Sequence, residues 1–160
     1  MTVILIAIVI LAFLVFIIYN KTRKNFAICL MYHSIDDKPG KEGIFVDEFE
    51  EQIKLIKDKI SFKMEELKNM NYKLPKNSIL VTFDDGYKNN YTLAYPILKK
   101  YNIKATIFLN TRYVGNNADY LSWENVREMY ESGLVDFQMH THSHDLTIKR
   151  IKVVDFYEKD

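Results

Sequence analysis

The chain has 160 residues, a length typical of one domain, and 48% of them are hydrophobic. Its 22 basic and 21 acidic side chains nearly cancel, which leaves no basis for a nucleic-acid partner. A single cysteine excludes an intrachain disulfide and any metal site built from several cysteines.

The chain begins with a nearly continuous apolar run over residues 3–19. With the two residues before it, this run is long enough to cross a bilayer core, which takes about 20 helical residues. No basic residue precedes it and no small-residue cleavage site follows it. It therefore predicts an uncleaved, single-pass transmembrane anchor over 1–19 rather than a removed signal peptide. A buried core helix is the alternative, which the absence of any polar face disfavours.

A basic juxtamembrane linker over residues 20–26 follows and includes Lys21, Arg23 and Lys24. The positive-inside rule would keep the domain after it in the cytoplasm. The function considered below instead favours a membrane protein whose domain lies outside the cytoplasm. Charge alone leaves the orientation open. Residues 27–160 are the expected folded domain.

Apolar runs and amphipathic segments alternate through the rest of the chain. Four short apolar runs predict buried strands, over residues 26–32, 79–83, 105–109 and 134–139. Three amphipathic stretches predict helices, starting at Asp47, over 91–101 and after Ser122. This alternation predicts a parallel sheet covered by helices. Cys29, inside the first strand, is expected to be buried as a small hydrophobic residue.

Two of these helices have expected caps. Asp47 is the predicted N-cap of the first helix, with Glu50 three residues later as its capping-box partner. Ser122 is the predicted N-cap of the third, with Asn125 at the third helical position. Gly133 is the predicted residue just past its end.

The segment after the first helix is ambiguous. The helical spacing of apolar residues extends through Ile60 to Met64 and Leu67, which is consistent with one long helix. Residues 60–62 also fit a short strand between two helices. Periodicity alone leaves both possibilities open.

The strand over 79–83 ends in two adjacent carboxylates, Asp84 and Asp85, followed by Gly86. Adjacent like charges repel each other. A bound cation would offset them by holding one carboxylate and leaving the other free as a base. Asp-Asp-Gly is also a common turn sequence, so this stretch alone is consistent with either interpretation.

Three of the four histidines follow the last predicted strand: His140, His142 and His144. A surface histidine tract is the alternative, but such a tract would not begin at the end of a buried strand. A helical turn would bring His140 and His144 to one side, with His142 pointing elsewhere. Because parallel strands end at a common edge, these imidazoles and the Asp pair can converge there. Two imidazoles and one carboxylate suit zinc, iron or cobalt.

These motifs resemble the polysaccharide deacetylases of carbohydrate esterase family 4, which share a NodB-type domain. Residues 82–86 (TFDDG) are similar to the family's first motif and residues 140–144 (HTHSH) to its second. Residues 31–35 (MYHSI) resemble the opening strand of the branch that acts on bacterial surface polymers. Three further segments are similar to the family: 95–101, 105–108 and 121–123. The resemblance extends from about residue 30 to residue 146.

The resemblance implies that Asp85, His140 and His144 bind a divalent metal, usually zinc, and that Asp84 is the general base. It implies hydrolysis of acetamide groups on N-acetylglucosamine polymers such as peptidoglycan, poly-N-acetylglucosamine or chitin. It also favours the short strand over 60–62. Further candidates for contacts with the ligands or the substrate are His33, Thr82, Tyr87, Thr141 and His142. A structural role for His33 is equally consistent with its position after a strand.

Members of the family continue for several more strands, which carry an arginine that positions the base, a substrate wall and a late histidine that acts as general acid. No counterpart of that arginine, wall or histidine follows the second motif here. The expected fold is therefore α/β, a partial (β/α) barrel of the polysaccharide deacetylase type preceded by one transmembrane helix. Its last strand is then an unpaired edge. A second chain is a candidate source of the missing half.

Three functions stay open. The first is a membrane-anchored, metal-dependent deacetylase. The second is a remnant that binds metal or glycan without turnover, since the expected general acid has no counterpart. The third is a small membrane protein that binds a partner through its anchor and edge strand.

Overall fold

The structure is a computed structural model that describes residues 2–22 and 27–144. Its helices are α1 (Thr2–Thr22), α2 (Val46–Ile56), α3 (Glu66–Asn69), the π-helical segment η1 (Asn90–Ala94), α4 (Tyr95–Tyr101) and α5 (Trp123–Glu131). Its strands are β1 (Ala27–Tyr32), β2 (Ser34–Asp36), β3 (Gly43–Phe45), β4 (Ile60–Ser61), β5 (Ser78–Phe83), β6 (Ala105–Leu109) and β7 (Val135–Met139).

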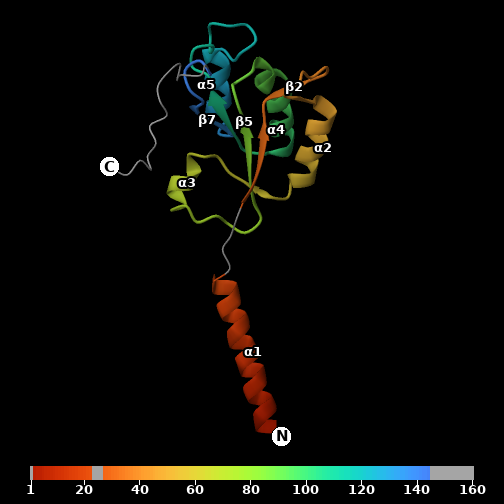
Figure 1. Ribbon diagram of the computed structural model, residues 1–160, viewed down its shortest axis with the longest axis vertical. Helices are drawn as coiled ribbons and strands as arrows, with labels where there is room; N and C mark the ends of the chain where they lie inside the picture. Colours follow the sequence, from red (N-terminus) through yellow and green to blue (C-terminus); the bar gives the residue numbers. More distant parts are fainter. Residues whose placement is uncertain (1, 23–26, 145–160) are drawn as a thin grey trace, which may run out of the picture.

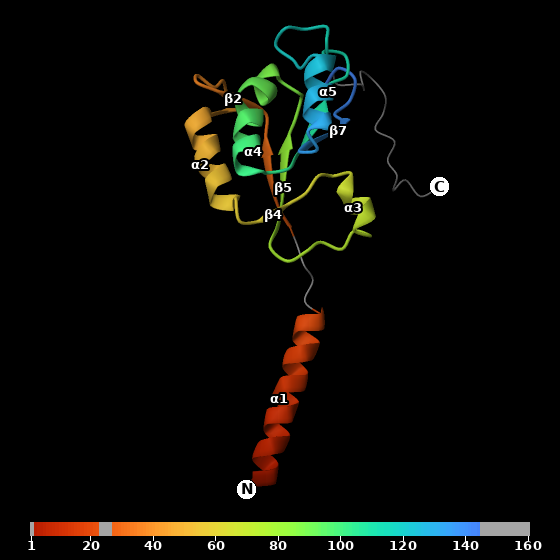
Figure 2. The ribbon, with the colours of Figure 1, turned by 180° about the vertical axis from the view of Figure 1, so that it is seen from behind.

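Five parallel strands form the main sheet, in the order β1-β5-β6-β7, and β4 pairs with the start of β5. Strands β2 and β3 form a separate two-stranded sheet. Helices α2 and α4 lie side by side on the sheet (Figures 1 and 2). The predicted parallel sheet with covering helices is confirmed. Strand β5 pairs on both sides and lies under helices, which explains why four of its six residues are apolar.

The aromatic centre of the core joins the sheet to α2. The ring of Phe49 in α2 lies 5.0 Å from that of Tyr32 and 5.7 Å from that of Phe83, centroid to centroid. Ile53, one helical turn further along α2, is fully buried. Phe83 is the last residue of β5, so this packing holds the strand end from which Asp84 and Asp85 follow.

Strand β1 is less buried than its sequence predicts. It lies at an edge of the described sheet, with one neighbour, β5. Cys29 is exposed, as are Ile28 and Met31, so the expectation of a buried cysteine is wrong. An apolar run in the sequence shows only that a strand could be buried. The order of the strands in the sheet decides which strand lies at the edge and is therefore exposed.

The first predicted helix cap is also wrong. The residue that precedes α2 is Phe45, and no side chain caps the helix, so Asp47 lies inside the first turn. Glu50 instead accepts hydrogen bonds from Lys100 and from the Tyr101 hydroxyl, both at 2.7 Å. These contacts tie α2 to α4. A carboxylate that finds partners on a neighbouring helix is not available for a local capping box.

The cap of α5 is confirmed. Ser122 and Asn125 form a reciprocal capping box, and Gly133 follows the helix with a φ of +77°. The short strand after α2 is confirmed as β4, which rules out one long helix. The expected helix over 91–101 divides into η1 and α4. π-Helical segments often mark functional sites, and η1 begins with the buried Asn90.

Helix α1 covers the segment that was expected to be a transmembrane anchor. Among the residues that the structure describes, no helix combines the length and the apolar character that a bilayer crossing requires. The predicted anchor over 1–19 is therefore not supported. Arg23 and Lys24, which bear on the predicted orientation, lie outside the described residues.

Strand β7 is the other edge of the described sheet, where it pairs with β6 alone, as the sequence predicts for residues 134–139. Met139 at its end is 76% exposed. A second chain that pairs with this edge stays a prediction. The edge matters for the site because β7 leads directly into His140.

Candidate functional site

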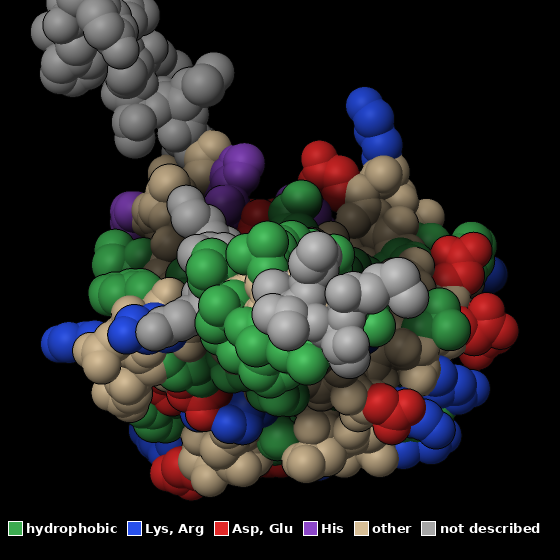
Figure 3. All heavy atoms as spheres, turned by 90° about the horizontal axis from the view of Figure 1, so that it is seen from below, with side chains coloured by type: hydrophobic (Ala, Val, Ile, Leu, Met, Phe, Trp, Pro, Cys, Tyr) green, Lys and Arg blue, Asp and Glu red, His purple; other side chains and the backbone are tan. Residues whose placement is uncertain are grey.

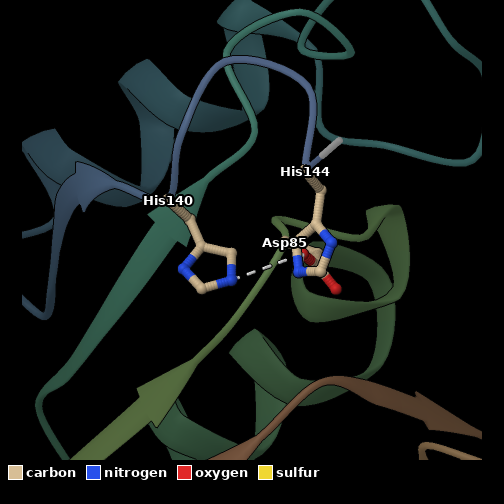
Figure 4. A group of neighbouring side chains, drawn as sticks. All are labelled: Asp85, His140 and His144. Carbon is tan, nitrogen blue, oxygen red and sulfur yellow. Dashed lines mark ion pairs between the residues drawn. The ribbon is translucent and has the colours of Figure 1, made fainter. Parts of the chain in front are cut away.

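Three side chains that follow strand ends converge at one rim of the sheet. Asp85 follows β5, and His140 and His144 follow β7 (Figure 4). The Nε2 atoms of His140 and of His144 each lie 3.8 Å from Oδ1 of Asp85. One donor atom from each of the three residues lies within 4.8 Å of the others. The predicted convergence is present.

This donor set fits a divalent metal. Zinc binds imidazole nitrogen and carboxylate oxygen at about 2.0–2.2 Å in tetrahedral sites, so two of its ligand atoms lie roughly 3.4 Å apart. The two 3.8 Å separations are close to that spacing. The Asp85 side chain is only 7% exposed, whereas that of His144 is 60% exposed. A buried carboxylate facing two more accessible imidazoles leaves an open side for water or substrate.

A loop, not a helical turn, brings the two imidazoles together, so the expected local geometry is wrong. Thr141 and His144 both adopt left-handed backbone conformations, with φ of 69° and 56°. The hydroxyl of Thr141 accepts a hydrogen bond from the backbone N–H of His144 at 3.0 Å. Thr141 therefore acts on the site by shaping this loop.

Asn110 positions Asp85, and the sequence reasoning missed it. Asn110 is 1% exposed, and its Nδ2 donates a 2.7 Å hydrogen bond to Oδ1 of Asp85. It directly follows β6, at the same sheet edge as the other site residues. Its position directly after a predicted strand could have identified Asn110 as a candidate site residue from the sequence. Asn110 thus holds in place the same oxygen, Oδ1, that lies 3.8 Å from both imidazoles.

Two left-handed residues in succession turn the chain at the Asp pair: Asp85 has φ of 71° and Gly86 has φ of 73°. Glycine adopts this conformation without strain and aspartate occasionally does, whereas most other residues are strained in it. A Cβ atom on Gly86 would also lie 2.6 Å from Cδ2 of Leu109.

We expect Gly86→Ala to lower the free energy of unfolding by about 1–3 kcal/mol, through backbone strain and the contact with Leu109. Chemical denaturation measures the loss. Gly133→Ala is the matched control, because Gly133 has a φ of +77° but nothing within 4 Å of an added Cβ atom. Its loss should be smaller. Equal losses for the two variants would show that the Leu109 contact contributes nothing.

His142 lies apart from the other two histidines. Its Nδ1 atom lies 3.1 Å from the hydroxyl of Thr111, and its carbonyl accepts from the backbone N–H of Arg112 at 2.8 Å. The side chain thus joins the loop after β7 to the loop after β6. Figure 3 shows histidine side chains gathered on one side of the molecule, beside acidic ones.

We expect His142→Ala to bind zinc within a fewfold of the parent affinity, since its ring contacts Thr111 and not the Asp85 group. Calorimetric titration with zinc measures this. A drop comparable to that of His140→Ala would mean that the wrong pair of imidazoles has been assigned.

His33 lies near the same carboxylate. One donor atom from each of His33, Glu42 and Asp85 lies within 4.8 Å of the others. The buried Asn90 donates a 2.8 Å hydrogen bond from Nδ2 to the carbonyl of His33 and so holds this residue in place. Glu42 directly precedes β3. The sequence did not identify it as a candidate site residue, because it lies in a polar loop where a carboxylate is common.

The remaining candidates differ in their contacts. The Tyr87 ring stacks on Tyr120, with centroids 5.2 Å apart, and Tyr120 stacks on Tyr113 at 4.7 Å. Burial, and then the charge of Asp85, raise the pKa of Tyr87 to about 12. Tyr87 thus borders the site. Thr82 faces β1 instead: its hydroxyl donates to the carbonyl of Leu30 at 3.5 Å.

Asp84 adjoins the group without belonging to it. Its backbone N–H donates a 2.8 Å hydrogen bond to the carbonyl of Tyr32, which joins the end of β5 to the end of β1. Its side chain is half-buried and is not one of the clustered donors. Asp84 is therefore free for a role other than metal binding.

The family model described as polysaccharide deacetylase matches residues 71–153, which include both the Asp pair and the histidine cluster. The chain belongs to the polysaccharide deacetylase family. A curated relative, the poly-beta-1,6-N-acetyl-D-glucosamine N-deacetylase of Staphylococcus aureus (strain MSSA476), is 39% identical over 81% of this chain and 48% of the relative. The protein of the same name from Staphylococcus epidermidis is 35% identical over 76% of this chain and 50% of its own length.

Solved structures share the fold of this chain. The Streptococcus pyogenes deacetylase PplD, in complex with acetate, has a TM-score of 0.67 and 34% identity, covering 74% of this chain and 57% of that chain. IcaB from Ammonifex degensii has a TM-score of 0.66 and 29% identity, covering 75% and 55%. This member of the polysaccharide deacetylase family spans about half the length of the curated relatives that it matches.

Proposed function

We propose that this chain carries the metal centre of an N-deacetylase that acts on N-acetylglucosamine polymers. The convergence of Asp85, His140 and His144 at one rim of the sheet carries the proposal. Membership of the polysaccharide deacetylase family supports it. The names of the curated relatives make a β-1,6-linked N-acetylglucosamine polymer the first substrate to test. A polymer at the bacterial surface would place the domain outside the cytoplasm.

Asp85, His140 and His144 are the proposed metal ligands. A divalent cation held by them, with zinc as the first choice for this donor set, supplies Lewis acidity that makes water nucleophilic near neutral pH and offsets charge on an acetamide oxygen. Asn110 keeps the Asp85 carboxylate in position through its 2.7 Å hydrogen bond. Residues that orient metal ligands in this way commonly contribute 10–100-fold to affinity or activity.

Asp84 is the proposed general base. Asp84 directly precedes Asp85 in the chain, and its carboxylate is not among the clustered donor atoms, so it remains able to accept a proton from the attacking water. Attack on the acetamide carbon is followed by cleavage of the C–N bond. Acetate leaves, and the sugar nitrogen takes up a proton to become a free amine. Tyr87 and His33 border the space in which the acetamide would lie.

Release of acetate from a β-1,6-linked N-acetylglucosamine oligomer tests the proposal. The chain loaded with zinc should release acetate, and a chelator should stop the release, with recovery when zinc is added back. Acetate release that persists in the chelator would overturn the metal role. Zinc binding without acetate release would instead identify a chain that binds metal without turnover, the second function left open by the sequence.

A further inference from the structure

A second group of donor atoms shares Asp85 with the candidate metal centre. It consists of His33, Glu42 and Asp85, with one donor atom from each within 4.8 Å of the others. Oδ1 of Asp85 lies 3.8 Å from the Nε2 atoms of His140 and His144. A carboxylate has two oxygens with about four lone-pair positions, so Oδ2 remains able to bind another cation. Asp85 can therefore belong to two metal sites at once.

The pairing of β2 with β3 brings the other two members of this group together. The two strands are parallel, and Ser34 lies opposite Gly43 where the short sheet begins. His33 and Glu42 directly precede these two residues in the chain. Neighbouring strands lie about 4.7–4.9 Å apart, so the main chain itself sets the two side chains side by side. Their approach follows from the strand pairing and not from a chance contact of surface side chains.

Two asparagines at the start of η1 hold the segment that carries His33. Nδ2 of the fully buried Asn90 donates a 2.8 Å hydrogen bond to the carbonyl of His33. Nδ2 of Asn89 donates to the hydroxyl of Ser34 at 2.7 Å, and its Oδ1 accepts from the backbone N–H of Ile35 at 3.4 Å. A segment that is already ordered loses less conformational entropy when a ligand binds.

The donor groups lie close together without bonding to one another. Within residues 2–22 and 27–144, neither the His33 imidazole nor the Glu42 carboxylate forms a hydrogen bond or an ion pair with another side chain. The carboxylates of Glu42 and Asp85 lie within 4.8 Å of each other and repel, and a cation between them would offset that repulsion. One imidazole and two carboxylates are donors that suit zinc or manganese.

We propose that His33, Glu42 and Asp85 bind a second divalent cation, with Asp85 as the ligand that the two ions share. This site deepens the proposed metal centre and rests on it, since both use the same carboxylate. In two-metal centres the ions lie about 3.5–4 Å apart, and the second ion adds to the Lewis acidity of the first. Glu42 is exposed and His33 partly buried, so the second site is open on one side to water or substrate.

The test counts the metal ions bound to each chain. The full chain is dialysed to equilibrium against zinc, and its metal content is measured by mass spectrometry. We expect two zinc ions per parent chain and one in Glu42→Gln, because the amide keeps the shape of the side chain without its charge. One zinc ion in the parent, or two in Glu42→Gln, would overturn the proposal.

Two further variants check the assignment. His33→Ala removes a donor outright and should also bind one zinc ion, so two ions in this variant would contradict the assigned ligands. Glu48→Gln is the matched control, because Glu48 is an exposed carboxylate in the first turn of α2. It should still bind two ions. Loss of an ion there as well would assign that ion to general surface charge and overturn the site. Circular dichroism confirms that each variant is folded.

Electron paramagnetic resonance with manganese tests whether the two ions share Asp85. Two manganese ions about 3.5–4 Å apart couple magnetically, so the spectrum of the parent should broaden relative to that of Glu42→Gln. Two bound ions with the spectrum of isolated manganese would place the second ion elsewhere and overturn the proposal.

These outcomes separate the second site from the chemistry. A second ion that depends on Glu42 and His33 supports the site even if the parent chain releases no acetate. Acetate release by a parent chain that binds one ion overturns the second site and leaves the deacetylase function standing.

Discussion

Replacing Asp85 with asparagine is expected to lower the zinc affinity by at least about 100-fold, because even residues that only support metal ligands contribute 10–100-fold. The substitution keeps the shape of the side chain but removes the charge that faces His140 and His144 at 3.8 Å. Calorimetric titration with zinc measures the change in affinity. The neutral amide can still accept the hydrogen bond of Asn110, so a general loss of folding is not expected.

Asp58→Asn is the matched control for Asp85→Asn. Asp58 is an exposed carboxylate in the turn after α2, so the same change of charge there should leave zinc affinity unaltered. If Asp85→Asn binds zinc as tightly as the parent, the carboxylate does not hold the metal, and the proposed centre is wrong.

Replacing Asp84 with asparagine is expected to separate rate from metal binding. The rate of acetate release should fall by about 10²–10⁴-fold, the usual contribution of a general base. Zinc affinity should stay within a few fold of the parent value, because Asp84 is outside the clustered donors. Single-turnover acetate release and zinc titration on the same preparation measure the two effects.

The two variants form a matched pair because they lie at adjacent positions and remove the same charge. We expect Asp84→Asn to release acetate more slowly and Asp85→Asn to bind zinc more weakly. Loss of zinc binding by Asp84→Asn would contradict the division of roles between the two carboxylates.

The sequence predicted the sheet from one physical rule: short apolar runs that alternate with amphipathic segments form parallel strands with helical connections. It failed where a residue's surroundings depend on the order of the strands. Cys29 is exposed because β1 is an edge. Glu50 leaves its predicted capping box because Lys100 and Tyr101 on α4 offer it hydrogen bonds.

For the candidate site, the sequence by itself determined which donor types follow the strands and at which edge they meet, because parallel strands end on the same side of a sheet. Asp85, His140 and His144 follow from that rule. The tertiary structure alone decided how they meet. The left-handed loop at Thr141, the hydrogen bond from Asn110 and the approach of Glu42 are contacts or backbone conformations that depend on three-dimensional packing, and no local pattern of residues encodes them.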